Sequence, residues 1–372
     1  MPTTEHRSEA KNRRSRTEYQ LAVEIQDDQG RPLGQWPIRI DWKPAVEHLQ
    51  FAAIAAGRVA PVLATPDYLL EPEWLEDRGA PWVQSIRISI ATDDGRPWSE
   101  SIPVDYFRSA AEKVSSALVD EGRLESGQTF EYRTLAFVRE SAPPGTDGHD
   151  RDVVEEPLVL DIADADLASR LDRSTVIGAG DPDDVPVLIR PDVLEETRAR
   201  VREAGEVETG GVLLGRLARD AAGGRLCLEI TAQVPARHTR SASMKLTFTH
   251  ETWSDARAAL QLRQSDEIFV GWWHSHPDWC RKCPSERQEV CPLRRIFFST
   301  DDCSLHRTVF PRAYQVGLLL TDRTDGIIPT LFGWRRGMIR ARAFHVDGSP
   351  EAIGPADAPL ATIGGHENAP TH

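Results

Sequence analysis

Short apolar runs alternate with segments of helical character along the C-terminal half of the chain. Strand patterns occur at 187–189, 210–215, 226–230, 268–273, 314–320 and 330–334, and helical patterns occur at 192–201 and 252–262. When strands and helices interleave in this way, the helices pack on the faces of a sheet. We therefore predict a mixed α/β layer fold for residues 185–345.

The N-terminal part of the chain has a different pattern, in which pairs of strands surround glycine-containing turns. Strand patterns occupy 19–25, 36–42, 86–90, 102–104 and 130–134, and a helical pattern occupies 106–118. Two strands that are joined by a short turn form a hairpin, so the first four strands predict two hairpins. We predict an α+β domain over residues 19–139, in which we recognise no catalytic residues.

Three segments have the composition of chain outside a packed core. Residues 1–18 are basic and almost free of apolar side chains, which predicts a disordered leader. Residues 140–184 contain many acids and the sequence Pro-Pro-Gly, which predicts a linker region with one short strand near 158–160. Residues 346–372 are rich in Gly, Pro and Ala and predict a flexible tail.

Charge and composition narrow the classes of partner. The chain has 372 residues and a formal net charge of -14. An acidic chain repels phosphate backbones, which disfavours nucleic acid as a partner. The sequence has neither the pattern of a secretory signal nor an apolar stretch long enough to cross a bilayer. We therefore expect a cytoplasmic protein with no membrane partner, in which cysteines stay reduced.

Two histidines continue the alternation of the predicted strand at 268–273. Side chains two residues apart on a strand project to the same face, so His274 and His276 can offer two imidazoles to one ion. Zinc binds imidazole nitrogens at about 2.0–2.1 Å. A His-x-His pattern by itself also fits a surface or structural role.

The segment that starts at Ser299 carries an acid three residues later, at Asp302. Serine is a common N-cap residue and an acid belongs in the first helical turn, so this pattern fits an ordinary helix start. Alternatively, Asp302 is a third ligand that binds through oxygen. Three protein ligands leave a fourth position open for water, as in catalytic zinc sites. Asp301 is adjacent, but the spacing favours Asp302.

Glu208 precedes the glycine-rich strand pattern at 210–215. An acid in such a place is often exposed to solvent. Beside a metal-bound water, however, a carboxylate is the group that can take up and return a proton.

Together these segments resemble the JAMM motif of the JAB/MPN metalloprotease family. The matching parts are Glu208-Thr209-Gly210-Gly211, His274-Ser275-His276-Pro277 and Ser299-x-x-Asp302, in the order of the family. The resemblance implies an α/β fold with a mixed sheet and layers like those of cytidine deaminases. It implies a catalytic zinc bound by His274, His276 and Asp302. It also implies that Glu208 is the general acid/base and that Ser299 stabilises the tetrahedral intermediate.

In this family the reaction is hydrolysis of peptide or isopeptide bonds, often at the C-terminus of ubiquitin or a ubiquitin-like protein. The resemblance thus predicts a deubiquitinase-like isopeptidase of the prokaryotic type, which deconjugates or processes a ubiquitin-like protein. The N-terminal domain could dock this substrate or its conjugating enzymes. The alternatives are a non-catalytic scaffold that binds ubiquitin-like proteins and a general zinc peptidase. A zinc deaminase is disfavoured, because its His-x-Glu pattern would need a glutamate at His276.

Four of the five cysteines lie between positions 280 and 303, mostly in an insertion at 277–298. Cys280, Cys283, Cys291 and Cys303 have the spacing Cys-x2-Cys-x7-Cys-x11-Cys. Four thiolates form a closed tetrahedral site, so this spacing predicts a second, structural zinc, with His306 as the substitute if Cys303 points elsewhere. Free thiols in a flexible insertion are the alternative. Cys227 stands alone in a predicted strand and is expected in the core.

Overall fold

The computed structural model describes residues 18–75, 81–138, 156–222, 224–236, 248–278, 296–323 and 326–348. Contacts divide the chain into two compact units. Residues 41–69 and 88–100 belong to the larger unit together with the described chain from 156 onward, and the remaining N-terminal residues form the smaller unit. Within the described ranges, no helix has the length and apolar character required to cross a membrane.

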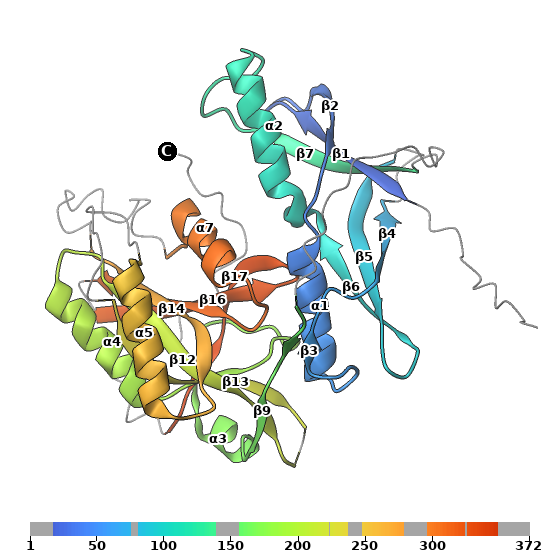
Figure 1. The fold of residues 1–372 in the computed structure, drawn as a ribbon. Helices are drawn as coiled ribbons and strands as arrows, with labels where there is room; N and C mark the ends of the chain where they lie inside the picture. Colours follow the sequence, from blue (N-terminus) through green and yellow to red (C-terminus); the bar gives the residue numbers. More distant parts are fainter. Residues whose placement is uncertain are drawn as a thin grey trace, which may run out of the picture. The chain divides into compact units, whose positions relative to one another are not determined.

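The larger unit is built on a mixed sheet (Figure 1). Its strands are β9 Ile162–Ala165, β10 Thr175–Ile177, β11 Val187–Ile189, β12 Gly210–Asp220, β13 Leu226–Pro235, β14 Ile268–His276, β15 Val316–Arg323, β16 Gly326–Arg335, β17 Met338–Arg342 and β18 Phe344–Val346. They lie in the order β10-β18-β11-β13-β12-β14-β15-β16-β17, and β9 also pairs with β12. The pairs β9·β12, β11·β13, β11·β18 and β14·β15 are parallel. The mixed α/β fold predicted from the sequence is confirmed.

Helices cover both faces of this sheet. They are α1 Lys43–Ala55, α3 Ala168–Arg173, α4 Pro191–Ala204, α5 His250–Arg263 and α7 Thr300–Val309. Side chains alternate along β12, so Leu213 faces the main core with α1 and α4, whereas Val212 and Leu214 pack with Ala256 of α5 on the opposite face. On that second face, Leu305 of α7 and Trp253 of α5 both pack against the cluster that contains Trp272. The end of β14 therefore lies next to α5 and α7.

The smaller unit packs a helix against a three-stranded antiparallel sheet. Its elements are β1 Tyr19–Gln26, β2 Pro32–Ile38, η1 Val104–Phe107, α2 Arg108–Asp120 and β7 Glu131–Val138. Val23 and Ile25 of β1 pack with Ala111 and Leu118 of α2. The predicted hairpin, helix and strand are present, but the second strand of the hairpin is Pro32–Ile38 instead of the predicted 36–42.

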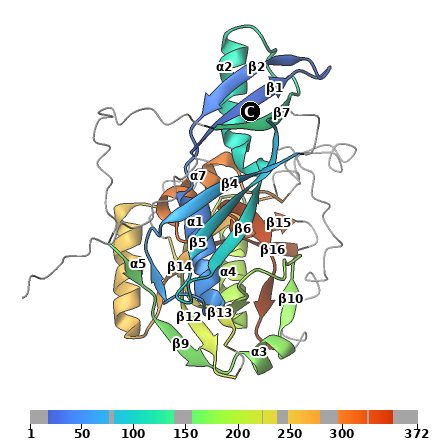
Figure 2. The same cartoon turned by 90° about the vertical axis from the view of Figure 1, so that its right-hand side faces the viewer.

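Two further sheets involve strands from the N-terminal part of the chain. Their bounds are β3 Val62–Leu63, β4 Tyr68–Trp74, β5 Val83–Ala91, β6 Pro97–Pro103 and β8 Leu158–Val159. β4, β5 and β6 form a three-stranded sheet (Figure 2), in which β5 and β6 are the second predicted hairpin. β3 pairs with β8, the short strand expected near 158–160.

Helix α1, which was not predicted, is part of the core of the larger unit. Phe51 and Ile54 lie in the same buried cluster as side chains of β11 to β16. The Glu47 carboxylate accepts a hydrogen bond from the Ala313 backbone N–H at 2.9 Å. Arg219 of β12 donates to the Ile54 carbonyl at 2.9 Å, near the C-terminal end of the helix. The composition-based boundary at 139 thus separates α1 from the strands it packs against, because those strands follow more than a hundred residues later.

Residues 156–184, expected as linker, contribute strands to the larger unit. β9 pairs with β12 and β10 pairs with β18. The buried Asp220 carboxylate accepts hydrogen bonds from the backbone N–H groups of Leu167 and Ala168, and Arg170 forms ion pairs with Glu229 and Asp347. Residues 346–348, expected as the start of the tail, are described as the end of β18 and its continuation. Polar composition was misleading here because the partners are distant in sequence.

Candidate metal centre

The two histidines lie at the C-terminal end of β14, as the sequence predicts. Trp272, His274 and His276 alternate along the strand and share one face, toward α5 and α7. On one edge β14 pairs with β12, where Gly210 is opposite His274. On the other edge it pairs with β15 as far as His276. Neighbouring strands on both edges thus fix the backbone that carries the histidines.

Glycines in β12 allow this close packing. A Cβ atom on Gly211 would lie 2.3 Å from the Val234 carbonyl oxygen and 2.6 Å from the indole nitrogen of Trp273. One on Gly215 would lie 1.9 Å from the Glu229 carbonyl oxygen. Side chains at these positions would push β12 away from β13 and β14, and the spacing at the site depends on these strands.

Helix α7 begins at a capping box formed by Ser299 and Asp302. The Ser299 hydroxyl accepts a hydrogen bond from the Asp302 backbone N–H at 3.1 Å. Asp302 Oδ2 accepts hydrogen bonds from the Ser299 backbone N–H and from its hydroxyl, both at 2.8 Å. The two interpretations of this segment are therefore compatible: the residues start a helix, and the same bonds orient the carboxylate.

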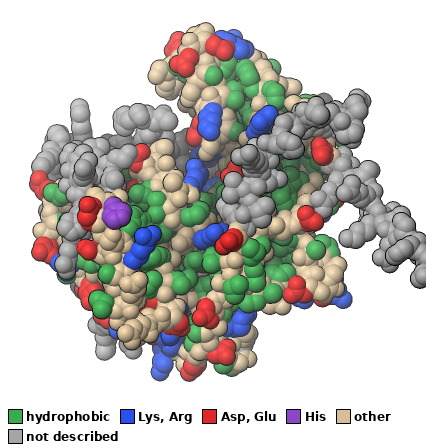
Figure 3. Space-filling model, viewed as in Figure 1, with side chains coloured by type: hydrophobic (Ala, Val, Ile, Leu, Met, Phe, Trp, Pro, Cys, Tyr) green, Lys and Arg blue, Asp and Glu red, His purple; other side chains and the backbone are tan. Residues whose placement is uncertain are grey.

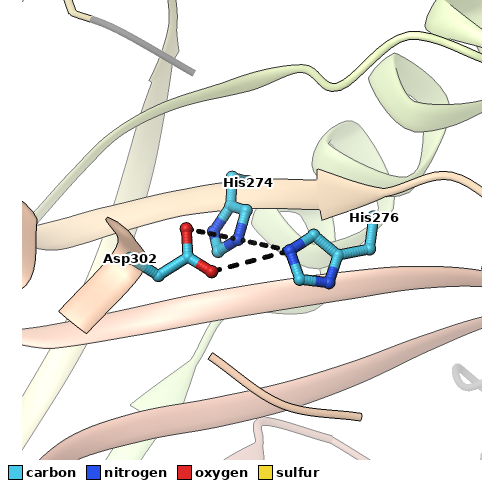
Figure 4. A group of neighbouring side chains, drawn as sticks. All are labelled: His274, His276 and Asp302. Atoms are coloured by element: carbon cyan, nitrogen blue, oxygen red, sulfur yellow. Dashed lines mark hydrogen bonds and ion pairs between the residues drawn. The ribbon is translucent and has the colours of Figure 1, made fainter. Parts of the chain in front are cut away.

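The three candidate ligand side chains point toward one another (Figure 4). The Nε2 atoms of His274 and His276 are 3.2 Å apart. Asp302 Oδ1 lies 3.3 Å from His274 Nε2, and Asp302 Oδ2 lies 3.6 Å from His276 Nε2. Ligands at about 2.0–2.1 Å from a tetrahedral zinc are roughly 3.3–3.4 Å from each other. The measured separations, which involve both oxygens of Asp302, lie near this spacing, and one ligand atom from each residue lies within 4.8 Å of the others, so the group could hold a metal ion such as zinc.

The two histidines are buried and Asp302 is partly buried, so the pKa of each of these side chains depends on burial and on the charges of its neighbours in the triad. On the face drawn in Figure 3, basic and acidic side chains are interspersed among apolar ones, whereas both histidines are buried. Burial alone would raise the pKa of Asp302, but the two histidines hold it well below its usual value. Burial lowers the pKa of His276, although Asp302 opposes this effect. A charged carboxylate and a neutral imidazole are the forms that bind metal.

Glu208 lies beside the triad. The Thr209 backbone N–H donates to the Ser275 hydroxyl at 3.0 Å, and the Ser275 backbone N–H donates to the Thr209 carbonyl at 2.8 Å. These two bonds extend the pairing of β12 and β14 and bring Glu208 alongside His276. Burial raises the pKa of Glu208 to about 7, and the charge of Asp302 adds to this effect, whereas His276 opposes it. The carboxyl group can therefore take up or release a proton near neutral pH.

The cysteine site stays a prediction. Cys280, Cys283 and Cys291 lie outside the described residues. Cys303 is partly buried on α7, and burial raises the pKa of its thiol. His306, the substitute ligand, is fully buried and accepts a hydrogen bond from Trp272, so it is a core residue. Cys227 lies in the core as expected.

Two neighbours of the triad were not singled out from the sequence. Trp272 stacks on His274, and Ser275 ties Thr209 to β14. The position of Trp272 could have been inferred, because it lies two residues before His274 and so shares its face. The Ser275 bond could not, because it depends on the register between two strands. Asp301, by contrast, is exposed and lies outside the group that could hold a metal ion.

Comparison with known proteins finds a family match for part of the chain. Residues 190–287 match the family model described as prokaryotic homologs of the JAB domain. The matched segment includes Glu208, His274 and His276 and ends before Ser299 and Asp302. A search of curated proteins finds no significant match.

One solved structure that resembles the chain is the solution structure of protein DSY2949 from Desulfitobacterium hafniense, a structural genomics target. The two share 18% sequence identity over 45% of this chain and 97% of the other, with a TM-score of 0.31. At that score the likeness adds nothing to the argument from the site.

Proposed function

Because the C-terminal half of the chain carries a JAB domain of the prokaryotic type, we propose that the protein is a zinc-dependent peptidase or isopeptidase. Its proposed substrate is the bond that follows the C-terminal residue of a ubiquitin-like protein, in a lysine conjugate or a precursor. The observation that carries the proposal is the spacing of His274, His276 and Asp302, with Glu208 beside them.

The residues present fit the chemistry of hydrolysis. A zinc ion held by His274, His276 and Asp302 would polarise the scissile carbonyl and favour ionisation of water. Glu208 accepts the proton that the attacking water loses. It then donates this proton to the leaving amine as the carbon–nitrogen bond breaks, which leaves a carboxylic acid and a free amine.

Ser299 has two possible contributions to this reaction. Its hydroxyl donates to Asp302 Oδ2, which supports a role in orienting the proposed ligand. To donate to the oxyanion of the tetrahedral intermediate, the same hydroxyl would have to turn away from this carboxylate. If Ser299 is an oxyanion donor, its loss should lower the rate by about 10²–10³ and leave metal affinity unchanged. If Ser299 orients the ligand Asp302, its loss should weaken metal affinity.

The sheet restricts how an extended substrate reaches the site. Substrate tails often bind as an added strand, with main-chain hydrogen bonds along a free edge. β14 is paired on both sides, so such a tail cannot add to the strand that carries the histidines. We propose that the tail approaches over the ends of the strands with small residues next to the scissile bond, as a terminal glycine would allow.

The test uses Glu208→Gln, which removes the proton-transfer group and keeps the size of the side chain. The wild-type protein should bind zinc and cleave a fusion in which a ubiquitin-like protein precedes a reporter. The variant should bind zinc equally and cleave at least a hundredfold more slowly, since general acid–base catalysis contributes about 10²–10⁴ in rate. Full activity in the variant would overturn the mechanism.

A second substrate separates the proposed specificity from general peptidase activity. An unstructured peptide with the same tail should be cleaved more slowly than the folded fusion. A preference for the peptide would favour the general zinc peptidase. Binding of the ubiquitin-like protein without cleavage by the zinc-loaded wild type would favour the non-catalytic scaffold.

A further inference from the structure

An indole ring lies flat against one of the proposed metal ligands. The rings of Trp272 and His274 are stacked, with centroids 4.6 Å apart and an angle of 10° between their planes. Both residues belong to β14 and are two positions apart, so the strand alternation brings their side chains to the same face. The Trp272 ring therefore limits the tilt of the His274 imidazole.

Trp272 is itself held by a hydrogen bond to a buried histidine on another element. Its indole N–H donates to Nδ1 of His306 on α7 at 3.0 Å. Trp272 is 1% exposed and His306 is 0% exposed. Burial lowers the pKa of His306 to about 3, so its ring is neutral and Nδ1 can accept. Loss of this hydrogen bond is unfavourable, because it would leave the buried indole N–H without either a protein partner or water.

Aromatic side chains surround this pair and hold its geometry. Phe310 stacks on both rings, with its ring centroid 6.3 Å from that of Trp272 and 6.3 Å from that of His306. Trp334 lies 5.5 Å from His306, and its indole N–H donates to the Phe310 carbonyl at 3.1 Å. Phe298 contacts the rings of Trp272 and His274 from another side. A close-packed cluster of this kind leaves little room for the indole to rotate.

The other ring nitrogen of His274 makes this stacking important. Metal-binding histidines almost always donate their second nitrogen to a carboxylate, carbonyl or water, and this bond orients the ring. His274 Nδ1 is buried and has no hydrogen-bond partner among the described residues. The described residues orient this ring through aromatic contacts instead: the flat stack on Trp272 and the tilted contact with Phe298.

We propose that Trp272 and His306 act together as positioning residues, which hold the His274 imidazole in the orientation that binds the metal. This inference rests on the proposed metal binding and adds two residues to it. His306 acts through the hydrogen bond to Trp272, and Trp272 acts through the stack on His274. Both residues are buried, so we assign them no contact with the substrate.

The experiment compares His306→Leu with His306→Asn in the full chain. Leucine removes the acceptor, whereas the amide oxygen of asparagine can take the place of Nδ1. Zinc affinity is measured by competition with a chromophoric chelator, and the unfolding of the metal-free protein is measured for each variant. His306→Leu should weaken zinc binding about 10–100-fold, the usual effect of losing such a partner, and His306→Asn should recover most of it.

Phe344→Leu is the matched control, because it removes a fully buried ring from the main core cluster of the same unit and leaves the hydrogen bond and its aromatic neighbours in place. It should lower the stability of the metal-free protein but change zinc affinity by less than threefold. If His306→Leu weakens zinc binding no more than Phe344→Leu does, or if His306→Asn gives no recovery, the inference is wrong.

Trp272→Phe keeps an aromatic ring that can stack on His274 but loses the N–H donor and part of the ring area. It should weaken zinc binding as His306→Leu does, and the double variant should be no weaker than either single one, because both remove the same bond. Additive losses would overturn the proposal, as would an unchanged visible spectrum of the cobalt-substituted variants. A wild-type protein that binds no zinc would instead refute the proposed function, so the two failures are distinguishable.

Discussion

Replacement of Phe51 by alanine tests whether α1 belongs to the core of the larger unit. Phe51 is 4% exposed, lies in the main buried cluster and has its ring 6.1 Å from that of Tyr314. Loss of a buried phenylalanine side chain lowers the free energy of unfolding by roughly 3–5 kcal/mol. A folded domain has only about 5–15 kcal/mol in total, so we expect Phe51→Ala to remove a large share of the stability of this unit.

Urea unfolding followed by circular dichroism measures this change. The matched control is Phe137→Ala, which removes the same side chain from β7 of the smaller unit, where it is 39% exposed. The control should change the free energy of unfolding by about 1 kcal/mol or less. Equal and small effects of the two substitutions would refute the assignment of α1 to the core.

Three further predictions follow from named contacts. Ser299→Ala should lower the free energy of unfolding by about 1 kcal/mol through loss of the helix cap, and it should also weaken zinc binding. Ser299→Thr should keep the stability and the zinc affinity of the wild type, as measured by chemical denaturation and chelator competition. His274→Ala should abolish both zinc binding and hydrolysis, measured by metal analysis and fusion cleavage; activity with zinc retained would contradict the ligand assignment. The Arg263 hydrogen bond lowers the pKa of Glu267 to about 2 despite its burial, so its contribution to stability is present above its usual pKa near 4.5 and lost as the pH falls toward 2. Glu267→Gln should flatten that part of the curve of unfolding free energy against pH, and an unchanged curve would contradict it.

Local patterns predicted most elements of the fold, because each depends on neighbours in sequence. The strands at 210–215 and 268–273 were predicted from apolar runs and alternation, and both exist with longer bounds. Helix α1 was missed, since its apolar face is explained only by strands that follow more than a hundred residues later. Residues 156–184 were assigned to a linker for the same reason: their short strands are stabilised by pairing with β12 and β18.

The candidate site could be predicted further than the fold around it. His274 and His276 follow from strand alternation, and Asp302 follows from its place in a helix start, so local geometry alone limits where these side chains point. The meeting of the three groups depends on how α7 packs against β14, which the motif could suggest only by resemblance. The burial of His306 among aromatic rings could not be predicted, because this packing has no local signature in the sequence.

The capping box has a consequence for the entropy of metal binding. Asp302 is held by its own helix start, and the histidines are held by a strand paired on both edges. A site that is assembled from flexible segments must lose conformational freedom when the ion binds, and this loss weakens affinity. Here the three ligands are already ordered by regular secondary structure. Metal-free and metal-bound forms should therefore have nearly the same backbone at this site. Little of the free energy of metal binding should be offset by the entropic cost of ordering the ligands.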